Sequence, residues 1–218
     1  MRQETLLQQD DGIPASGVLN TKEILARLCD KDPHRRLIIT PLLEKSQVAD
    51  GAVDIRLSTE FIVTRRTEFP SLDVKDAAEH AKNAWRYQTW QRINFGEKMV
   101  LHPNELVLAS TFEYICLPND IFAYVLSRSS WGRLGLVVAT ATAINPGYKG
   151  CLTLEMVNLG RVPLVLYPGL PVAQLILHLA SPGEFNAPYD CPTGPEPSNV
   201  YSNEKKREEL KFWATERQ

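Results

Sequence analysis

The chain of 218 residues has a formal net charge of −2 and is 44% apolar, a composition typical of a folded globular protein. It has no excess of basic residues, which argues against nucleic acid as a partner bound through its backbone. Its apolar stretches are of strand length, as in Leu170–Leu179, which Pro171 and Gln174 interrupt, so no membrane partner is expected.

Residues 1–18, rich in Gln and Asp, predict a flexible N-terminal extension. They lack the apolar segment that a secretory signal needs. The four cysteines stand far apart with no Cys-x-x-Cys spacing, which indicates reduced thiols used for packing: Cys29, Cys116, Cys151 and Cys191. We therefore expect a cytoplasmic protein.

One domain, mostly of short strands, is predicted for residues 19–181. It begins with a helix that Asn20 and Glu23 start in a capping-box pattern and that reaches about Cys29. Alternating or β-branched segments then predict three strands: Leu37–Ile39, Ala52–Leu57 and Phe61–Thr64. The Ala-rich segment Asp73–Gln88 is the one long helix expected, and it interrupts the series of strands.

From Lys98 onward the pattern is that of an all-β protein. Turn residues such as Asn145-Pro-Gly147 and Pro168-Gly169 separate the expected strands, which are Met99–Leu101, Leu106–Ser110, Tyr114–Leu117, Phe122–Leu126, Val137–Ala141, Cys151–Asn158, Leu164–Tyr167 and Val172–Leu179. Strands at this spacing favour a mainly β barrel or jelly roll with a few short helices. Residues 182–218 are expected to form a C-terminal tail, helical over Asn203–Glu216.

The segment from Arg128 to Arg133 concentrates groups that bind anions. It reads Arg-Ser-Ser-Trp-Gly-Arg, so that two guanidinium groups, two hydroxyls and the N–H groups of a turn lie close together. Charged bidentate donors and turns of this kind suit phosphate oxygens. The alternative interpretation is a charged turn that forms salt bridges with its surroundings.

One carboxylate, Glu155, lies in an apolar strand. Alternation places Leu152, Leu154 and Met156 on one face and Cys151, Thr153, Glu155 and Val157 on the other. If the face of Glu155 lines a pocket, desolvation would raise the pKa of this carboxyl toward that of a useful base. The alternative is a solvated glutamate on the outside of a half-buried strand.

Two amides and four histidines complete the candidates. Asn145 lies in a turn that its residue types alone explain, and Gln174 lies in an apolar strand, where a core hydrogen bond explains it as well as a ligand would. The histidines are isolated, with no zinc-deaminase spacing: His34, His80, His102 and His178. We expect no protein-bound metal, and Mg²⁺ only as a companion of nucleotide phosphates.

These residues fall in an order that resembles the dCTP deaminase branch of the dUTPase-like superfamily. The resemblance extends from about Val18 to Leu179. Its motifs are Gly51-Ala-Val-Asp-Ile-Arg-Leu57, Leu101-His-Pro-Asn-Glu-Leu106, Arg128-Ser-Ser-Trp-Gly-Arg133, Ile144-Asn-Pro-Gly-Tyr-Lys-Gly150, Leu152-Thr-Leu-Glu155, Pro168-Gly169 and Ala173-Gln-Leu175. As a set they are specific, although each alone is weak.

The resemblance implies a distorted jelly-roll barrel, a homotrimer with active sites between subunits, and deamination of a deoxycytidine nucleotide without zinc. It implies that Glu155 is the general base that activates water for attack on C4 of cytosine. Ser129 and Arg133 would position this water and the carboxylate. The implied substrate contacts are Arg128, Ser129 and Ser130 with the phosphates, Thr153 and Leu154 with the base edge, Asn145 and Gln174 near the sugar and phosphates, and Tyr189 at the start of a C-terminal lid.

The chain also departs from the family pattern. Asn145 replaces the usual aspartate, and an amide can bind a hydroxyl but cannot act as a base. Ser127 replaces a glycine, and the lid residues around Tyr201 differ from those of the family. We therefore expect dCTP deamination to dUTP and ammonia. The alternatives are a bifunctional enzyme that gives dUMP, and a regulator that binds the nucleotide without turnover.

Overall fold

A computed structural model describes residues 17–65, 87–139 and 143–180 of the chain. The described elements are α1 (Thr21–Leu28), β1 (Ile38–Thr40), the 3₁₀ helix η1 (Lys45–Gln47), β2 (Val48–Ala49), β3 (Ala52–Thr64), β4 (Gln88–Arg92), β5 (Met99–Leu101), β6 (Leu106–Cys116), β7 (Ile121–Ser127), α3 (Ser129–Gly132), β8 (Leu136–Val138), β9 (Ala143–Ile144), β10 (Lys149–Asn158), β11 (Leu164–Leu166) and β12 (Pro171–Leu179). No helix within these ranges is long and apolar enough to span a bilayer.

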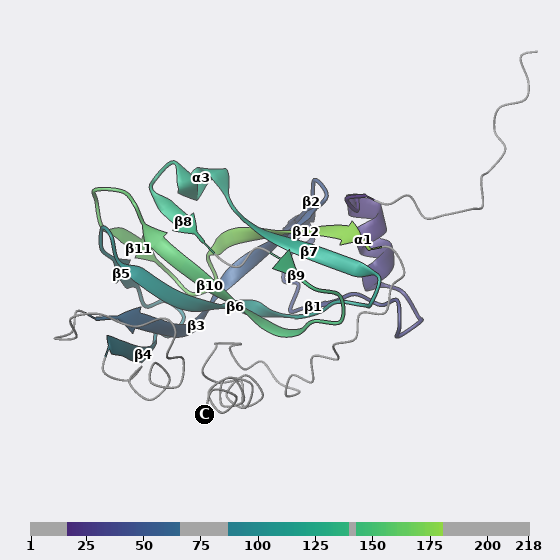
Figure 1. Ribbon diagram of the computed structural model, residues 1–218, viewed down its shortest axis with the longest axis horizontal. Coiled ribbons are helices and arrows are strands. Elements are labelled where there is room, and N and C mark those ends of the chain that lie inside the picture. The colour runs from purple at the N-terminus through teal and green to yellow at the C-terminus, as the bar shows by residue number, and fades with distance from the viewer. Residues whose placement is uncertain (1–16, 66–86, 140–142, 181–218) are drawn as a thin grey trace, which may run out of the picture.

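Within the described ranges, ten strands form one curled antiparallel sheet, and β5 and β11 form a small second one (Figure 1). The large sheet runs in the order β8-β10-β6-β3-β12-β7-β9, with β1 on β6 and both β2 and β4 on β3. The apolar residues of both halves meet inside, where Ile55, Leu57, Leu154 and Met156 are fully buried. The prediction of a mainly β fold is confirmed.

The long strand β3 carries the chain from one half of the sheet to the other. Its first residues, up to Arg56, pair with β12, and from Leu57 onward it pairs with β6 and, further along, with β4. The register shifts between Leu57 and Phe61, which is the irregularity that lets a strand bend at a corner. The first half of β3 is therefore hydrogen-bonded to β12 and its second half to β6, so that this one strand belongs to both halves of the sheet.

Several sequence expectations are confirmed and others need correction. The capping box of Asn20 and Glu23 is present, and β5 has the predicted bounds. The predicted pairs of strands over 52–64 and 106–117 are instead the single strands β3 and β6, because bulges interrupt the alternation without ending the pairing. Gln88, predicted as helical, begins β4, which was not predicted. The rest of the 73–88 helix, except Tyr87, and the tail helix lie outside the described residues.

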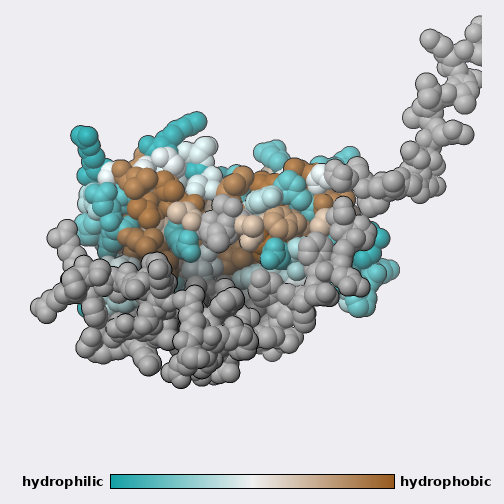
Figure 2. Space-filling model, in the orientation of Figure 1, coloured by the Kyte–Doolittle hydropathy of each residue, from teal (hydrophilic) through white to brown (hydrophobic). Residues whose placement is uncertain are grey.

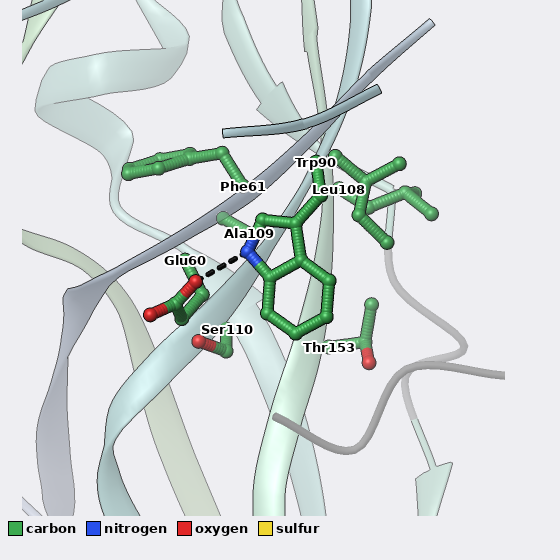
Figure 3. Close-up of a pocket in the computed structure, with 8 residues that line it drawn as sticks. Glu60, Phe61, Trp90, Leu108, Ala109, Ser110 and Thr153 are labelled. Atoms are coloured by element: carbon green, nitrogen blue, oxygen red, sulfur yellow. Dashed lines mark hydrogen bonds between the residues drawn. The ribbon is translucent and has the colours of Figure 1, made fainter. Parts of the chain in front are cut away.

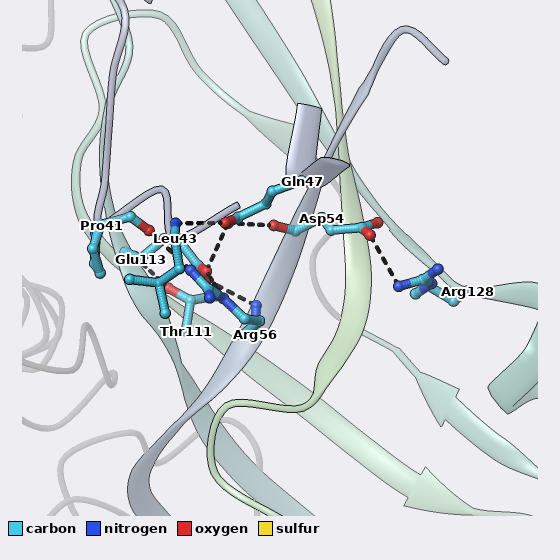
Figure 4. A network of polar contacts seen from close by, with 8 residues as sticks. All are labelled: Pro41, Leu43, Gln47, Asp54, Arg56, Thr111, Glu113 and Arg128. Atoms are coloured by element: carbon cyan, nitrogen blue, oxygen red, sulfur yellow. Dashed lines mark hydrogen bonds and ion pairs between the residues drawn. The ribbon is translucent and has the colours of Figure 1, made fainter. Parts of the chain in front are cut away.

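A buried ion pair joins β3 to β6 (Figure 4). The Glu113 side chain is fully buried, and its Oε1 accepts from Arg56 Nε at 2.6 Å and from Gln47 Nε2 at 2.9 Å. Its Oε2 accepts from the Arg56 backbone N–H at 2.9 Å. Arg56 Nη2 donates to the Pro41 carbonyl at 2.9 Å, and the Thr111 hydroxyl donates to the Glu113 carbonyl. Both charges are thus partnered where water is excluded.

The first prediction concerns this pair. Changing Glu113 to Gln leaves the Arg56 charge buried without its counter-ion, so we expect a loss of about 3–5 kcal/mol in unfolding free energy, measured by urea denaturation. Glu60→Gln is the control, since Glu60 pairs with the exposed Arg92 at 3.5 Å, and we expect a change of less than about 1 kcal/mol. Equal effects of the two variants would contradict the structural role assigned to Glu113.

Candidate active site

The turn predicted to bind anions, Arg128 to Arg133, begins where β7 ends. Arg128 precedes the single turn α3, and its Nη1 lies 3.0 Å from Asp54 Oδ2 on β3. The other carboxylate oxygen, Asp54 Oδ1, accepts from Gln174 Nε2 on β12 at 3.1 Å. The structure thus brings two of the predicted substrate contacts, Arg128 and Gln174, together on one carboxylate.

Side chains on both sides hold this turn in place. Before it, the Ser127 hydroxyl accepts from Val138 N at 3.0 Å and donates to the Val138 carbonyl at 3.3 Å. Within it, Trp131 Nε1 donates to the Pro171 carbonyl at 2.7 Å. Ser127, noted in the sequence only as replacing a glycine, therefore ties the end of β7 to β8.

The anchored turn exposes the groups predicted to meet phosphates. Ser129, Ser130 and Arg133 are exposed, whereas Arg128 is half-buried. Within the described residues, Arg128 is the one of these that forms an ion pair. The turn thus presents two hydroxyls and a guanidinium to solvent, with a second guanidinium held at its base. The exposed donors agree with the interpretation as an anion site. The Arg128–Asp54 ion pair agrees with the alternative, a charged turn that forms a salt bridge.

Glu155 lies on the outer face of β10. Alternation holds from Thr153 to Asn158, with Leu154 and Met156 buried and with Thr153 and Glu155 half-buried. Cys151, predicted to share the face of Glu155, is buried instead, because the register shift between Cys151 and Thr153 breaks the alternation. Thr153 and Glu155 therefore share a face that is partly open to solvent.

A small pocket that Thr153 helps to line lies on this face (Figure 3). Glu155 pairs with Leu108 on β6, which pairs with Ile62 on β3, which pairs with Trp90 on β4. Residues directly opposite one another in antiparallel strands share a face. These four side chains therefore lie in one row across the sheet, from Glu155 on β10 to Trp90 on β4. The pocket is lined by Glu60, Phe61, Ile62, Trp90, Leu108, Ala109, Ser110 and Thr153. Trp90 Nε1 donates to Glu60 Oε2, which fixes the indole over the pocket.

The remaining predicted residues lie in different settings. The Leu154 side chain is fully buried in the core, so a contact between Leu154 and a base would use its backbone. Asn145 is exposed, and its carbonyl accepts from Tyr148 N at 3.2 Å in the turn after β9. Tyr189 lies outside the described residues.

Two thiols near the start of β10, those of Cys116 and Cys151, are poor nucleophiles. Burial raises the pKa of the Cys151 thiol to about 11, with a smaller contribution from the charge of Glu113. Burial also raises the pKa of Cys116, although the nearby Lys149 opposes this effect. Because the thiolate is the reactive form of cysteine, these two thiols are not expected to act as nucleophiles at neutral pH.

Within one chain the carboxylate and the turn are not joined. Ala139 N donates to the Glu155 carbonyl at 2.7 Å, and Leu159 N donates to the Gly135 carbonyl at 2.8 Å. Glu155 and Leu159 are four residues apart in the chain, which is about 13 Å at the rise of a strand. Arg133 precedes Gly135, at the end of this ladder away from Glu155. The described residues show no hydrogen bond between the Glu155 side chain and either Ser129 or Arg133.

Sequence reasoning missed three residues of this region. Asp54 appears in the sequence only as part of the motif from Gly51 to Leu57, although a carboxylate in an apolar strand is the same signal that identifies Glu155. Trp90 lies on β4, a strand that the sequence does not predict, and Glu60 lies on β3 between the two strands predicted there. No group of three or more His, Cys, Asp or Glu side chains gathers as a metal site in the part of the chain that the structure describes.

Comparisons with known proteins identify the family of this chain. A family model for dCTP deaminase-like proteins matches residues 18–180. The dCTP deaminase of Halorubrum lacusprofundi is 38% identical over 195 residues, which cover 85% of this chain and 92% of that protein. The dUMP-forming dCTP deaminase of Methanobrevibacter smithii is 39% identical over 159 residues, 72% of this chain and 79% of that protein.

A solved structure shows the same fold. The 2′-deoxycytidine 5′-triphosphate deaminase of Agrobacterium tumefaciens superposes with a TM-score of 0.58 at 22% identity. The match covers 77% of this chain and 49% of that chain, so this protein spans about half of the solved chain. The family match over most of the sequence confirms the resemblance carried by its motifs, and the chain belongs to the dCTP deaminase-like family.

Proposed function

We propose that the protein deaminates dCTP by hydrolysis, giving dUTP and ammonia, with Glu155 as the general base. The observation that carries this proposal is the half-buried carboxylate on the outer face of β10, in a chain of the dCTP deaminase-like family. The relatives from Halorubrum and Methanobrevibacter both bear the name dCTP deaminase, which supports the choice of substrate.

The reaction needs one water molecule and one proton carrier. Glu155 takes a proton from water while the oxygen forms a bond to C4 of the cytosine ring. This first proton passes to N3 of the ring. The proton of the new C4 hydroxyl then passes through Glu155 to the exocyclic nitrogen, the C4–N bond breaks, and ammonia leaves as the C4 carbonyl forms. Ser129 and Arg133 would orient the water and the carboxylate, and a positioned base of this kind contributes about 10²–10⁴-fold to the rate.

The phosphates would bind at the turn before β8. Arg128 and the hydroxyls of Ser129 and Ser130 supply charged and neutral donors there. The substrate would be the Mg²⁺ complex of the nucleotide, with the ion held mainly by phosphate oxygens. Thr153 and the Leu154 backbone would contact the base, Asn145 and Gln174 the sugar side, and Tyr189 the closed lid.

Two chains would complete each site in a homotrimer. Arg133 and Glu155 lie at different ends of the β8–β10 ladder in one chain, so a neighbour's turn would have to meet the carboxylate. Exposed apolar side chains support such an association, since large apolar patches mark contact surfaces. Figure 2 shows brown, apolar areas on one face, and the exposed large apolar residues of the described chain include Leu134, Leu159 and Val162.

A second candidate function is the bifunctional reaction that gives dUMP. It is favoured by the names of the relatives from Methanobrevibacter smithii and Halobacterium salinarum, both dUMP-forming dCTP deaminases at 39% and 37% identity. Asn145 opposes it, because an amide cannot take a proton from the water that would attack the phosphate chain. We therefore keep dUTP as the proposed product.

The second prediction tests the base. Glu155→Gln keeps the shape of the side chain but removes its proton acceptor, so kcat for ammonia release from dCTP should fall at least about 10²-fold. Binding of dCTP, measured by calorimetry, should stay within about threefold of wild type, a margin well below the cost of one charged hydrogen bond.

Glu105→Gln is the matched control, because Glu105 is also half-buried but only accepts from His102 N in a turn. Its activity should equal that of wild type. A Glu155→Gln variant that still deaminates dCTP at the wild-type rate would refute the assigned base. Wild-type protein that binds dCTP without turnover would support a regulator.

The third prediction concerns the product. Wild-type protein with dCTP and Mg²⁺ should give dUTP, resolved from dUMP by anion-exchange chromatography. Asn145→Asp restores a carboxylate, so pyrophosphate release should appear or rise while ammonia release continues. Formation of dUMP by the wild type would establish the bifunctional reaction and contradict the role given to Asn145.

A further inference from the structure

Asp54 links the two predicted substrate contacts that the fold brings together. Each of its carboxylate oxygens accepts one hydrogen bond, Oδ2 from Arg128 Nη1 at 3.0 Å and Oδ1 from Gln174 Nε2 at 3.1 Å. The three side chains come from β3, β12 and the end of β7, which are neighbours in the sheet. No other ion pair of Arg128 or amide contact of Gln174 is present among the described residues.

The backbone that carries Asp54 is itself held firmly. Gln47 Nε2 donates to the Asp54 carbonyl at 3.0 Å and to Glu113 Oε1 at 2.9 Å, so one amide connects Asp54 to the buried ion pair. Figure 4 shows this path from Glu113 through Gln47 to Asp54 and on to Arg128. Asp54 also pairs with Gln174 across β3 and β12, which brings their side chains to one face. The carboxylate is therefore fixed before any ligand binds.

The contacts decide which atoms remain for a ligand. A guanidinium has five N–H donors in a fixed plane, and Asp54 uses one of them, so donors remain for phosphate oxygens. The Gln174 amide nitrogen has two N–H donors and uses one of them on Asp54, which fixes the direction of the carbonyl oxygen and leaves it as the acceptor of this side chain. An acceptor suits a sugar hydroxyl, whereas it would repel a phosphate.

We propose that Asp54 is a positioning residue for the nucleotide: it aims Arg128 at the phosphates and turns the Gln174 oxygen toward a sugar hydroxyl. This inference rests on the proposed function of the same site. A role of Asp54 in blocking Arg128 would have the opposite effect on nucleotide affinity. If Asp54 merely blocked Arg128 until a phosphate displaced it, removing its carboxylate would tighten nucleotide binding.

The fourth prediction separates these effects with steady-state kinetics on the full-length protein. Asp54→Ala frees Arg128 and Gln174 from their anchor, so KM for dCTP should rise about tenfold or more while kcat changes by less than about twofold. Asp54→Asn keeps an acceptor but loses the charge, so its KM should lie between those of wild type and Asp54→Ala. Asp30→Asn is the control, since Asp30 pairs with Arg35 at 3.6 Å and its carboxylate is 25% exposed against 23% for Asp54.

A double-mutant cycle tests whether Asp54 acts through Arg128. Arg128→Lys keeps the charge but not the planar fork, and adding Asp54→Ala to it should raise KM by less than about threefold, because the anchored group is already gone. Fully additive effects, an unchanged KM, or a lower KM in Asp54→Ala would overturn the inference.

The outcomes also distinguish this inference from the proposed function. Wild-type protein without dCTP turnover would refute the deaminase. Calorimetry with dCTP then decides the role of Asp54: weaker binding in Asp54→Ala upholds positioning, and binding equal to or tighter than wild type overturns it. Melting temperatures measured for every variant show whether a weaker affinity reflects unfolding, and rescue by Asp54→Asn excludes a loss of fold alone.

Discussion

The buried ion pair between Glu113 and Arg56 is the constraint on which the rest of the structure depends. A fully buried carboxylate is costly unless every lone pair that faces the interior has a donor, and here Arg56 and Gln47 supply those donors. Satisfying Glu113 fixes β3 against β6 at the point where the register of β3 shifts. The same donors also connect to Pro41 and to the Asp54 carbonyl, so the segment before β3 is held as well.

The site inherits its rigidity from this pair. Asp54 is two residues before Arg56 on β3, and alternation puts both side chains on the outer face of the strand. Arg56 pairs with the buried Glu113, and Asp54 pairs with Arg128. Arg128, which would bind phosphate, is thus held by a residue of β3, and the Arg56–Glu113 ion pair fixes the same strand. Positioning groups supported by packed strands are held more precisely than groups on free loops.

The sequence predicts those features of the fold and the site that depend on neighbouring residues, and it misses those that depend on contacts between distant ones. The capping box of Asn20, the bounds of β5 and the shared face of Thr153 and Glu155 follow from neighbours a few residues away, and the structure agrees with each. The merging of strands into β3 and β6 depends on bulges, which alternation cannot reveal. The contact of Asp54 with Arg128 joins residues 74 positions apart, and only the strand order β3-β12-β7 brings them together.

The separation of Glu155 from the turn has a consequence for how the proposed site would work. Arg128, Asp54 and Gln174 belong to one chain and are assembled by its own sheet. The carboxylate of Glu155 lies on another strand, and its proposed partner Arg133 lies at the far end of the β8–β10 ladder. Under the proposed arrangement, a single chain would retain the groups that bind phosphate, but association would supply the geometry for proton transfer. Affinity for the nucleotide and turnover would then depend on different parts of the structure, since catalysis requires reacting groups to be held in position and binding alone does not.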